Sequence, residues 1–192
     1  MSVGEPTRGQ RVLVIGLSPV KNQEVVASLR ELGVDAMGCT EPDTAAGRDD
    51  ARDFKLIAFG RAVLGPRADR LKQAFADQDP TVGFVDAFGP VAVAQVIAAL
   101  QHNLGTAVLL NDLTFTSDGR GGRITAAVLA ICHISVSLYR QSTQGSLEET
   151  CLLDADVAPG LMTCPLVAGE LHQAYSLVVI ADGQEFHHLP FL

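Results

Sequence analysis

The stretch Arg11-Val-Leu-Val-Ile-Gly16 decides the fold class of the first half of the chain. A continuous run of apolar residues that ends in glycine is typical of a strand that is covered on both faces in a parallel sheet. Ser18 and Pro19 follow as a good N-cap and first helical residue, and Gly33 supplies a stop after apolar residues with helical spacing. The sequence therefore predicts a strand followed directly by a helix.

The same alternation of strand and helix continues to about residue 100. Further strands are predicted at Val34–Cys39, Lys55–Gly60 and Thr81–Phe88, of which Lys55–Gly60 is expected to be buried. A loop or short weak helix and two longer helices are predicted at Glu41–Asp53, Pro66–Asp77 and Gly89–Leu100. Successive strand–helix units of this length close by right-handed crossovers into one parallel sheet with helices on both faces. We therefore expect a doubly wound α/β layer.

From Val12 to Leu100 the order of these elements resembles the receiver domains of response regulators and, more loosely, flavodoxin-like folds. A receiver carries an acidic pair after its first strand and a phosphorylatable aspartate at the end of its third strand. In this sequence Gly16-Leu17-Ser18 and Gly60-Arg61 occupy those places. Because carboxylates hold Mg²⁺ and accept the phosphoryl group in such sites, the resemblance implies a pseudo-receiver.

After His102 the spacing of apolar residues changes from a helical to an alternating pattern. The runs typical of strands are Thr106–Thr116, Arg123–Gln141, Leu147–Asp154, Leu161–Leu166, Tyr175–Ala181 and Gln184–Pro190. Turn-forming residues separate the runs, and Asp182-Gly183 is a strong hairpin signal. Six or seven short strands at this spacing indicate an antiparallel β-sandwich. The predicted fold class is α/β plus all-β, a doubly wound parallel sheet followed by a small antiparallel β-sandwich.

The change of period predicts two domains, 1–103 and 104–192, with a short connection between Gln101 and Thr106. The alternative is that Thr106–Leu110 forms a fifth strand of the first sheet. The segment from His133 to Phe191, with its Ala-Pro-Gly turn and Tyr-centred strand, resembles the immunoglobulin-like domains of the flagellar hook-capping type. Such domains are mostly spacers and docking surfaces, so the resemblance implies interaction rather than catalysis.

The charge balance limits the classes of partner. The 192 residues include 14 Lys and Arg against 22 Asp and Glu, a formal net charge of −8. Nucleic acids and anionic membrane surfaces attract proteins through basic residues, so we expect neither as a partner. After Arg140 the chain has acidic residues but no Lys or Arg. The second domain should therefore present an acidic face.

No apolar run is long enough for a signal-peptide core or a bilayer span, so we expect a cytoplasmic protein. The cysteines lack CxxC spacing and are expected to be small buried hydrophobes: Cys39, Cys132, Cys151 and Cys164. Adjacent strand residues face opposite sides, so neither Cys132 with His133 nor His187 with His188 should form a joint site. We expect His187 and His188 to be solvated on an edge strand, and we predict no metal site.

Ligands of open α/β sheets bind beyond the carboxyl ends of the strands, where the strand order reverses. The candidate binding residues there are Gly16, Ser18, Gly60, Arg61, Asp86 and Gly89. The helix N-terminus behind Ser18 could hold an anion with Arg61 as its counter-charge, or Ser18 merely caps its helix. Asp86 is either a perturbed carboxylate near this crevice or a hydrogen-bonded residue of a strand end. The glycine spacing fits neither a dinucleotide fingerprint nor a P-loop, so no cofactor is predicted.

Two functions from different classes remain. The first is a non-catalytic interaction or regulatory protein whose two domains dock another protein or, in a homo-oligomer, a second copy of the chain. It is favoured because the sequence contains no nucleophile elbow and no metalloprotease helix. The second is a small-molecule or nucleotide-binding protein, or an enzyme subunit, with its site at the carboxyl ends of the parallel strands.

Overall fold

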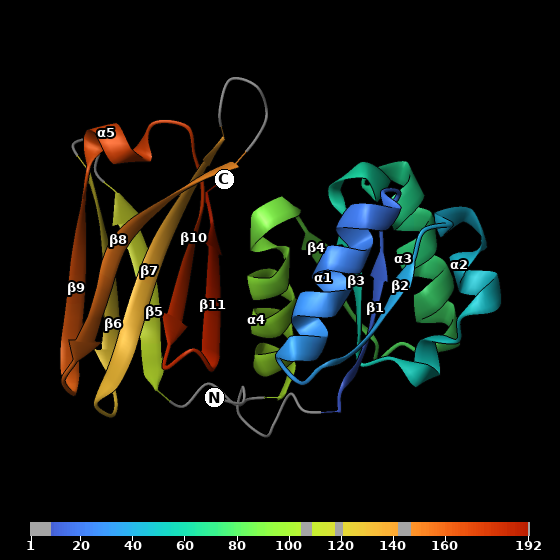
Figure 1. The fold of residues 1–192 in the computed structure, drawn as a ribbon, viewed down its shortest axis with the longest axis horizontal. Helices are drawn as coiled ribbons and strands as arrows, with labels where there is room; N and C mark the ends of the chain where they lie inside the picture. The colour runs from blue at the N-terminus through green and yellow to red at the C-terminus, as the bar shows by residue number, and fades with distance from the viewer. Residues whose placement is uncertain (1–8, 105–108, 118–120, 142–146, 192) are drawn as a thin grey trace. The chain divides into compact units, whose positions relative to one another are not determined.

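A computed structural model describes residues 9–104, 109–117, 121–141 and 147–191 of the chain. The chain divides into two compact units, Met1–Gly105 and Thr106–Leu192 (Figure 1). The first contains a parallel sheet with helices and the second contains antiparallel sheets, so the predicted fold class is confirmed. That each unit folds on its own stays a prediction.

The first unit is built on a four-stranded parallel sheet. Its strands are β1 (Arg11–Ile15), β2 (Asp35–Cys39), β3 (Leu56–Gly60) and β4 (Gly83–Ala87), in the spatial order β2-β1-β3-β4. All four lie within the stretches that the sequence assigns to strands. The chain places β2 on one side of β1 and then crosses to the other side to form β3. The strand order therefore reverses between β1 and β3.

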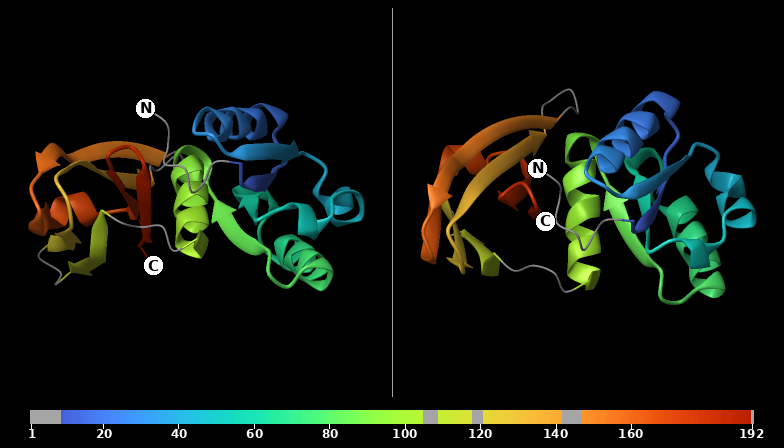
Figure 2. Two further views of the ribbon diagram at one scale, coloured as in Figure 1. Left: turned by 90° about the horizontal axis from the view of Figure 1, so that it is seen from below. Right: turned by 60° about the horizontal axis from the view of Figure 1, so that its bottom comes forward.

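Helices cover both faces of this sheet (Figure 2). On one face α1 (Pro19–Glu31) contacts α4 (Ala92–Leu104), and on the other α2 (Pro42–Arg48) contacts α3 (Pro66–Gln78). Odd-numbered residues of β1 and β3 pack in one core with α2 and α3, while their even-numbered neighbours are also buried. Burial on both faces explains the continuous apolar runs of these strands. Among the described residues, no helix is long and apolar enough to cross a bilayer.

The junction between the units differs from the prediction in where the last helix ends. The last helix does not end at Leu100, because α4 continues to Leu104. Residues 91–104 include no glycine or proline, so the sequence has no helix-stopping residue before Gly105. The next strand, β5 (Leu110–Ser117), pairs within the second unit and is not a fifth strand of the first sheet. Residues 106–108 lie outside the described part of the chain.

The second unit is a sandwich of two antiparallel sheets. One sheet has the order β5-β6-β9, with β6 (Gly121–Val128) and β9 (Gly160–Val167). The other has the order β11-β10-β7-β8 and consists of β7 (Cys132–Gln141), β8 (Leu147–Val157), β10 (Ala174–Ala181) and β11 (Glu185–Pro190). The short helix α5 (Ala168–Leu171) follows β9. Buried residues of both sheets form a single core, which confirms the predicted sandwich.

The run Arg123–Gln141, expected as one stretch, contains two strands. The chain turns at 129–131, and β6 and β7 belong to different sheets. Ile124 and Val128 face the core from one sheet, and Ile134 and Val136 face it from the other. Even-numbered residues are thus buried in both β6 and β7, so the alternation of buried and exposed residues gives no sign of the turn between the two strands.

The Asp182-Gly183 hairpin is confirmed. Both residues have positive φ, 52° and 65°, as a type I′ turn requires. The Gln184 N–H donates to the Ala181 carbonyl at 3.0 Å, which closes the turn between β10 and β11. Two of the other separators, at 118–120 and 142–146, fall outside the described residues.

Candidate functional site

The carboxyl edge of the parallel sheet brings Gly16 and Gly60 together. Gly16 follows β1, and its N–H donates to the Cys39 carbonyl at 2.9 Å. Gly60 ends β3, and a Cβ built there would lie 3.6 Å from the Cα of Gly16. The two glycines let the ends of β1 and β3 approach each other where the strand order reverses.

Ser18 and Arg61 each lie just beyond one of these glycines and are exposed. Ser18 is the N-cap of α1, and its Oγ accepts the Lys21 N–H at 3.5 Å. Of the two roles considered for Ser18, the structure therefore shows helix capping. Arg61 begins a short 3₁₀ turn after β3 and makes no ion pair among the residues that the structure describes. Gly89 follows β4 with a φ of 46°.

The Asp86 side chain is directed at α3, where it forms an ion pair with Lys72. It pairs in register with Phe59, and its Oδ1 accepts a hydrogen bond from Lys72 Nζ at 2.9 Å. The same ammonium lies 5.4 Å from the centroid of the Phe59 ring. Asp86 is therefore a strand-end residue held by an ion pair, the second of the two alternatives.

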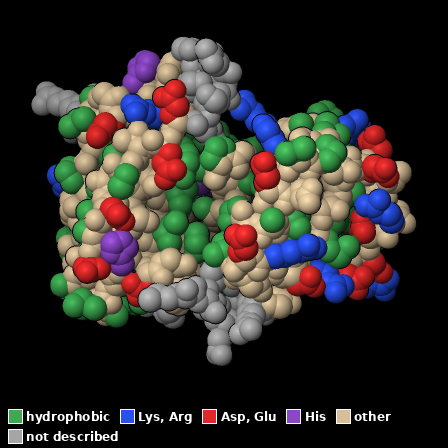
Figure 3. Space-filling model, in the orientation of Figure 1, with side chains coloured by type: hydrophobic (Ala, Val, Ile, Leu, Met, Phe, Trp, Pro, Cys, Tyr) green, Lys and Arg blue, Asp and Glu red, His purple; other side chains and the backbone are tan. Residues whose placement is uncertain are grey.

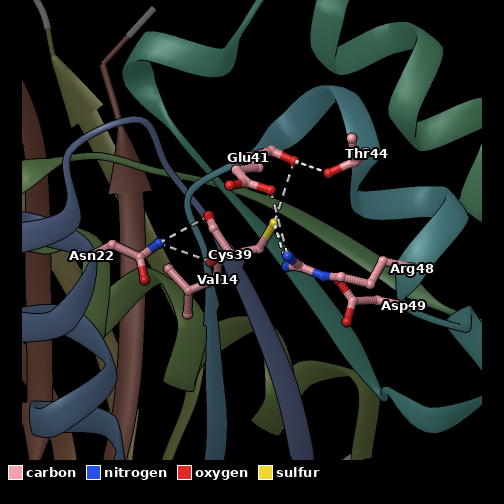
Figure 4. Close-up of polar contacts among 7 residues, drawn as sticks. All are labelled: Val14, Asn22, Cys39, Glu41, Thr44, Arg48 and Asp49. Atoms are coloured by element: carbon pink, nitrogen blue, oxygen red, sulfur yellow. Dashed lines mark hydrogen bonds and ion pairs between the residues drawn. The ribbon is translucent and has the colours of Figure 1, made fainter.

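Asn22 is a buried polar residue of α1 that sequence reasoning missed (Figure 4). Its Nδ2 donates to the Val14 carbonyl at 2.8 Å and to the Cys39 carbonyl at 3.4 Å. Its Oδ1 lies over Gly38, where an added Cβ would collide with it. The side chain thus ties α1 to β1 and β2. An isolated glycine inside a strand, here Gly38, was the signal of this close approach.

Cys39 makes a second set of polar contacts at the end of β2 (Figure 4). Arg48 Nη2 donates to its Sγ at 3.2 Å, and the thiol lies 3.6 Å from the Glu41 carbonyl. The pKa of Arg48 is raised by the sulfur of Cys39 and then by the carboxylates of Asp49 and Glu41. These contacts join β2 to α2 around the buried Cys39 side chain.

An open polar hollow lies at the opposite, amino edge of the sheet. Its volume is about 480 Å³, and its lining includes Arg11, Asp35 and Arg52. Arg11 Nε lies 2.8 Å from Asp35, and Arg52 Nη2 lies 2.6 Å from Asp50. Both arginines are therefore engaged by neighbouring carboxylates.

One end of the β-sandwich exposes large apolar side chains. In the turn between β6 and β7, Leu129 is 51% exposed and Ile131 is 75% exposed, and at the start of β9 Leu161 is 78% exposed. Val128 pairs with Gly160, which makes Leu129 and Leu161 diagonal neighbours on the outer face of their sheet. Figure 1 shows the β6–β7 and β8–β9 turns at the same end of the sandwich. We call Leu129, Ile131 and Leu161 the apolar tip.

Exposed aspartates of both sheets lie at the same end of the sandwich as the apolar tip, and we call them the acidic rim: Asp112, Asp154, Asp156 and Asp182. Asp156 pairs in register with His133, and Asp182 Oδ1 accepts the His133 N–H at 2.7 Å. Asp112 lies on β5 of the other sheet, at a bulge opposite β6. In Figure 3, acidic side chains and a histidine lie beside hydrophobic side chains at this lower end of the sandwich.

His133 bridges two residues of the acidic rim. Its Nε2 lies 2.9 Å from Asp154 Oδ1, and its Nδ1 lies 3.0 Å from Asp156 Oδ1. These hydrogen bonds raise the pKa of His133. Cys132 faces the core instead, where burial raises the pKa of its thiol. The two adjacent residues therefore have separate surroundings. Cys39 and Cys164 are buried as expected, but Cys151 on β8 is exposed, so the expectation of a buried cysteine is wrong there.

His187 and His188 of the edge strand β11 were expected to be solvated, but both are half-buried. His187 Nε2 lies 2.6 Å from Oε1 of the buried Glu185, whereas burial lowers the pKa of His188. Glu185 also accepts the N–H groups of Leu109 and Leu110, at 2.6 and 3.1 Å. No three metal-ligating side chains of the described residues have the arrangement of a metal site.

Comparison with known proteins does not place the chain in a family. No family model matches it, and no curated protein matches it. Two crystal structures of wild-type OgpA from Akkermansia muciniphila are similar to it with TM-scores of 0.29 and 0.30 at 8% sequence identity. The alignments cover 100% of this chain and 94% and 93% of those chains. At these values the likeness identifies neither a fold nor an activity.

Proposed function

We propose that the chain is a non-catalytic interaction or regulatory protein that docks a partner protein at the end of its β-sandwich. The observation that carries this proposal is the apolar tip, in which three large aliphatic side chains are at least half exposed. Single exposed leucines are ordinary, but several large aliphatic side chains exposed at one end of a domain beside polar groups are typical of a protein-interaction site. Burial of one such side chain is worth about 1.5–3 kcal/mol, which a partner would recover.

The topology of both units supports this proposal. The order β2-β1-β3-β4 equals the first four positions of a flavodoxin-like sheet, and the sandwich has the two-sheet architecture of immunoglobulin-like domains. Gly16 and Gly60 stand where a receiver has carboxylates, and Asp86 is neutralised by Lys72. A pseudo-receiver of this kind would serve as a regulatory surface. Acetyl phosphate with Mg²⁺ should leave the intact mass unchanged, and an added phosphoryl group would contradict this assignment.

The test of docking compares partners of the wild-type chain with partners of a tip variant. The variant carries Leu129→Ser, Ile131→Ser and Leu161→Ser, and the control carries Val167→Ser, which is 65% exposed at the other end of β9. After crosslinking in extracts of the source cells, a partner should be lost from the tip variant and retained by the control. If no partner depends on the tip, the proposed function is wrong.

A second candidate function is anion or nucleotide binding at the carboxyl edge of the parallel sheet. It is favoured by Arg61, which is exposed beside the switch in strand order and forms no ion pair with any described residue. An anion could bind between Arg61 and the first N–H groups of α1. A ligand at about a hundred times its Kd adds about 2.7 kcal/mol of stability. Thermal shifts with phosphate, ATP and FMN that are flat, or unchanged by Arg61→Ala, would exclude it.

A further inference from the structure

We infer that the apolar tip docks a cationic, apolar segment of another protein, with the acidic rim as its counter-charge. This inference rests on the proposed function and adds the chemistry of the partner. It is carried by exposed aspartates of both sheets at the same end of the sandwich as three exposed aliphatic side chains.

Residues of the acidic rim lie on both sheets at the end that carries the apolar tip, with Asp156 on the outer face of one sheet and Leu161 on the outer face of the other. On the β7 side, Ile131 precedes His133 by two positions, which is about 7 Å along a strand. His133 in turn contacts Asp154, Asp156 and Asp182. On the other sheet, Ala127 pairs with both Leu161 and Asn111, the residue before Asp112. Cationic groups that flank a docked apolar side chain would therefore meet carboxylates in either direction.

No Lys or Arg among the described residues of this unit lies at the tip to neutralise these carboxylates. Arg123 and Arg140 are the two that the described part contains. Arg123 pairs with Pro165, and Arg140 donates to Thr150 at 2.8 Å, both toward the other ends of their strands. His133 is already held between Asp154 and Asp156. The described part of this end of the sandwich thus exposes apolar and acidic side chains without a neighbouring Lys or Arg.

This charge pattern selects among the surfaces that could cover the tip. Two copies joined tip to tip would bring their acidic rims together, and like charges across an interface are costly. An anionic membrane surface would be repelled for the same reason. A segment with Leu, Ile or Phe between Lys or Arg residues satisfies both parts, because it fills the apolar tip and places cations against the rim.

Fluorescence anisotropy with labelled peptides tests this chemistry on the full chain. Four peptides of equal length combine Lys with Leu, Lys with Ser, Glu with Leu, and Ser with Leu. The Lys–Leu peptide should bind, and each of the other three should bind at least about tenfold more weakly, a difference of about 1.4 kcal/mol. Binding should also weaken between about 50 and 500 mM salt, because exposed charges are screened.

Matched variants connect the binding to the surface. Ile131→Ser with Leu161→Ser should weaken Lys–Leu binding at least about tenfold, while Val167→Ser should not. Asp112→Asn with Asp156→Asn should weaken the binding and flatten its salt dependence. Asparagine tolerates the positive φ of Asp112, so this pair should remain folded. Glu148→Gln is the control: it removes a carboxylate at the other end of β8 and leaves the acidic rim unchanged, so binding should not weaken.

Any one of four results would overturn the inference. The first is equal binding of the Lys–Ser peptide, or binding unaffected by the tip variants, because the attraction would then be charge alone. The second is a concentration-dependent dimer that the tip variant abolishes, which would make a second copy the occupant. The third is tip-dependent flotation with phosphatidylcholine vesicles. If the partners captured through the tip are neutral or acidic, this inference fails while the proposed function stands.

Discussion

Asn22 reaches from α1 to two strands, with its Nδ2 on the carbonyls of Val14 and Cys39 and its Oδ1 over Gly38. Asn22→Ala should cost about 1–3 kcal/mol, because buried acceptors lose their donor. Gly38→Ala should cost about 1–3 kcal/mol, because its methyl group collides with the amide. The double variant should cost less than the sum, since the shorter side chain makes room for the methyl group.

Urea unfolding of the three variants measures this coupling. Gly47→Ala in α2 is the control, because a Cβ there has no neighbour within 4 Å. It should be neutral or stabilising by up to about 1 kcal/mol, since alanine is the better helix former. Strictly additive losses for Asn22→Ala and Gly38→Ala would mean that the amide does not occupy the space above Gly38.

His133 should make the stability of the protein depend on pH. Its contacts with Asp154 and Asp156 raise its pKa in the folded state. A raised folded-state pKa stabilises the fold fully below the unfolded value of about 6.5, and the contribution disappears as the pH rises through the folded-state pKa. His133→Gln should therefore lower the urea midpoint more at about pH 5.5 than at about pH 9. His172→Gln, an exposed histidine outside this cluster, is the control. An equal loss at both pH values would show that the imidazole acts by packing alone.

At the scale of elements, burial on both faces makes β1 and β3 the plainest strands in the sequence. β1 and β3 are continuous apolar runs because helices cover both faces of the sheet. Each can therefore be predicted from its own residues, without knowing which strands pair with it. The turn between β6 and β7 could not be found in this way, since Ile124 to Leu138 keep one alternation across two sheets. Leu129 and Ile131 were therefore expected inside a strand run. Their exposure follows from the turn, and with it the apolar tip.

The carboxyl-edge site was only partly predictable for a related reason. The pattern places Gly16 and Gly60 at the switch point because both follow strands that the sequence reveals. Whether Asp86 faces the crevice or α3 depends on where Lys72 lies, which requires the packing of α3 on the sheet. Asn22 reads as an ordinary surface residue of a helix until Gly38 lies beneath it.

Glu185 joins β11 to the start of β5. Its carboxylate is buried and accepts the N–H groups of Leu109 and Leu110, and His187 also contacts it. Glu185→Ala should destabilise the protein by about 1.5–3 kcal/mol, because hydrogen bonds to a buried charged group are lost together. Hydrogen exchange should show faster exchange of the Leu109 and Leu110 amides. Glu148→Ala, on the exposed part of β8, should change neither quantity. Unchanged exchange at Leu109 and Leu110 would contradict the role of Glu185.

At the scale of the whole molecule, the two units differ in both surface and core. The first unit contains most of the Lys and Arg residues of the chain, the last of them Lys72. Several of these residues form ion pairs with carboxylates, as Arg11 and Arg52 do. The second carries most of its charge as acidic residues, and the ion pairs of its described residues are formed by histidines, as between His133 and Asp154. Each unit also has its own buried cluster, one beneath α2 and α3 and one between the two sheets of the sandwich. This separation is what independent folding requires.

Division of the chain after Gly105 should therefore give two folded pieces. Fragment 1–105 retains all of α4, which ends at Leu104, and fragment 106–192 retains Leu109 and Leu110 with their acceptor Glu185. Each should unfold cooperatively in urea with a single transition, because each keeps a complete core. A cut after Val128 is the control: it separates β6 from β9, its neighbour in the sheet, so neither resulting fragment should contain a closed sandwich. If the pieces made at Gly105 unfold without a transition while those made at Val128 are cooperative, the chain is not two domains, and the core of the sandwich depends on the first unit.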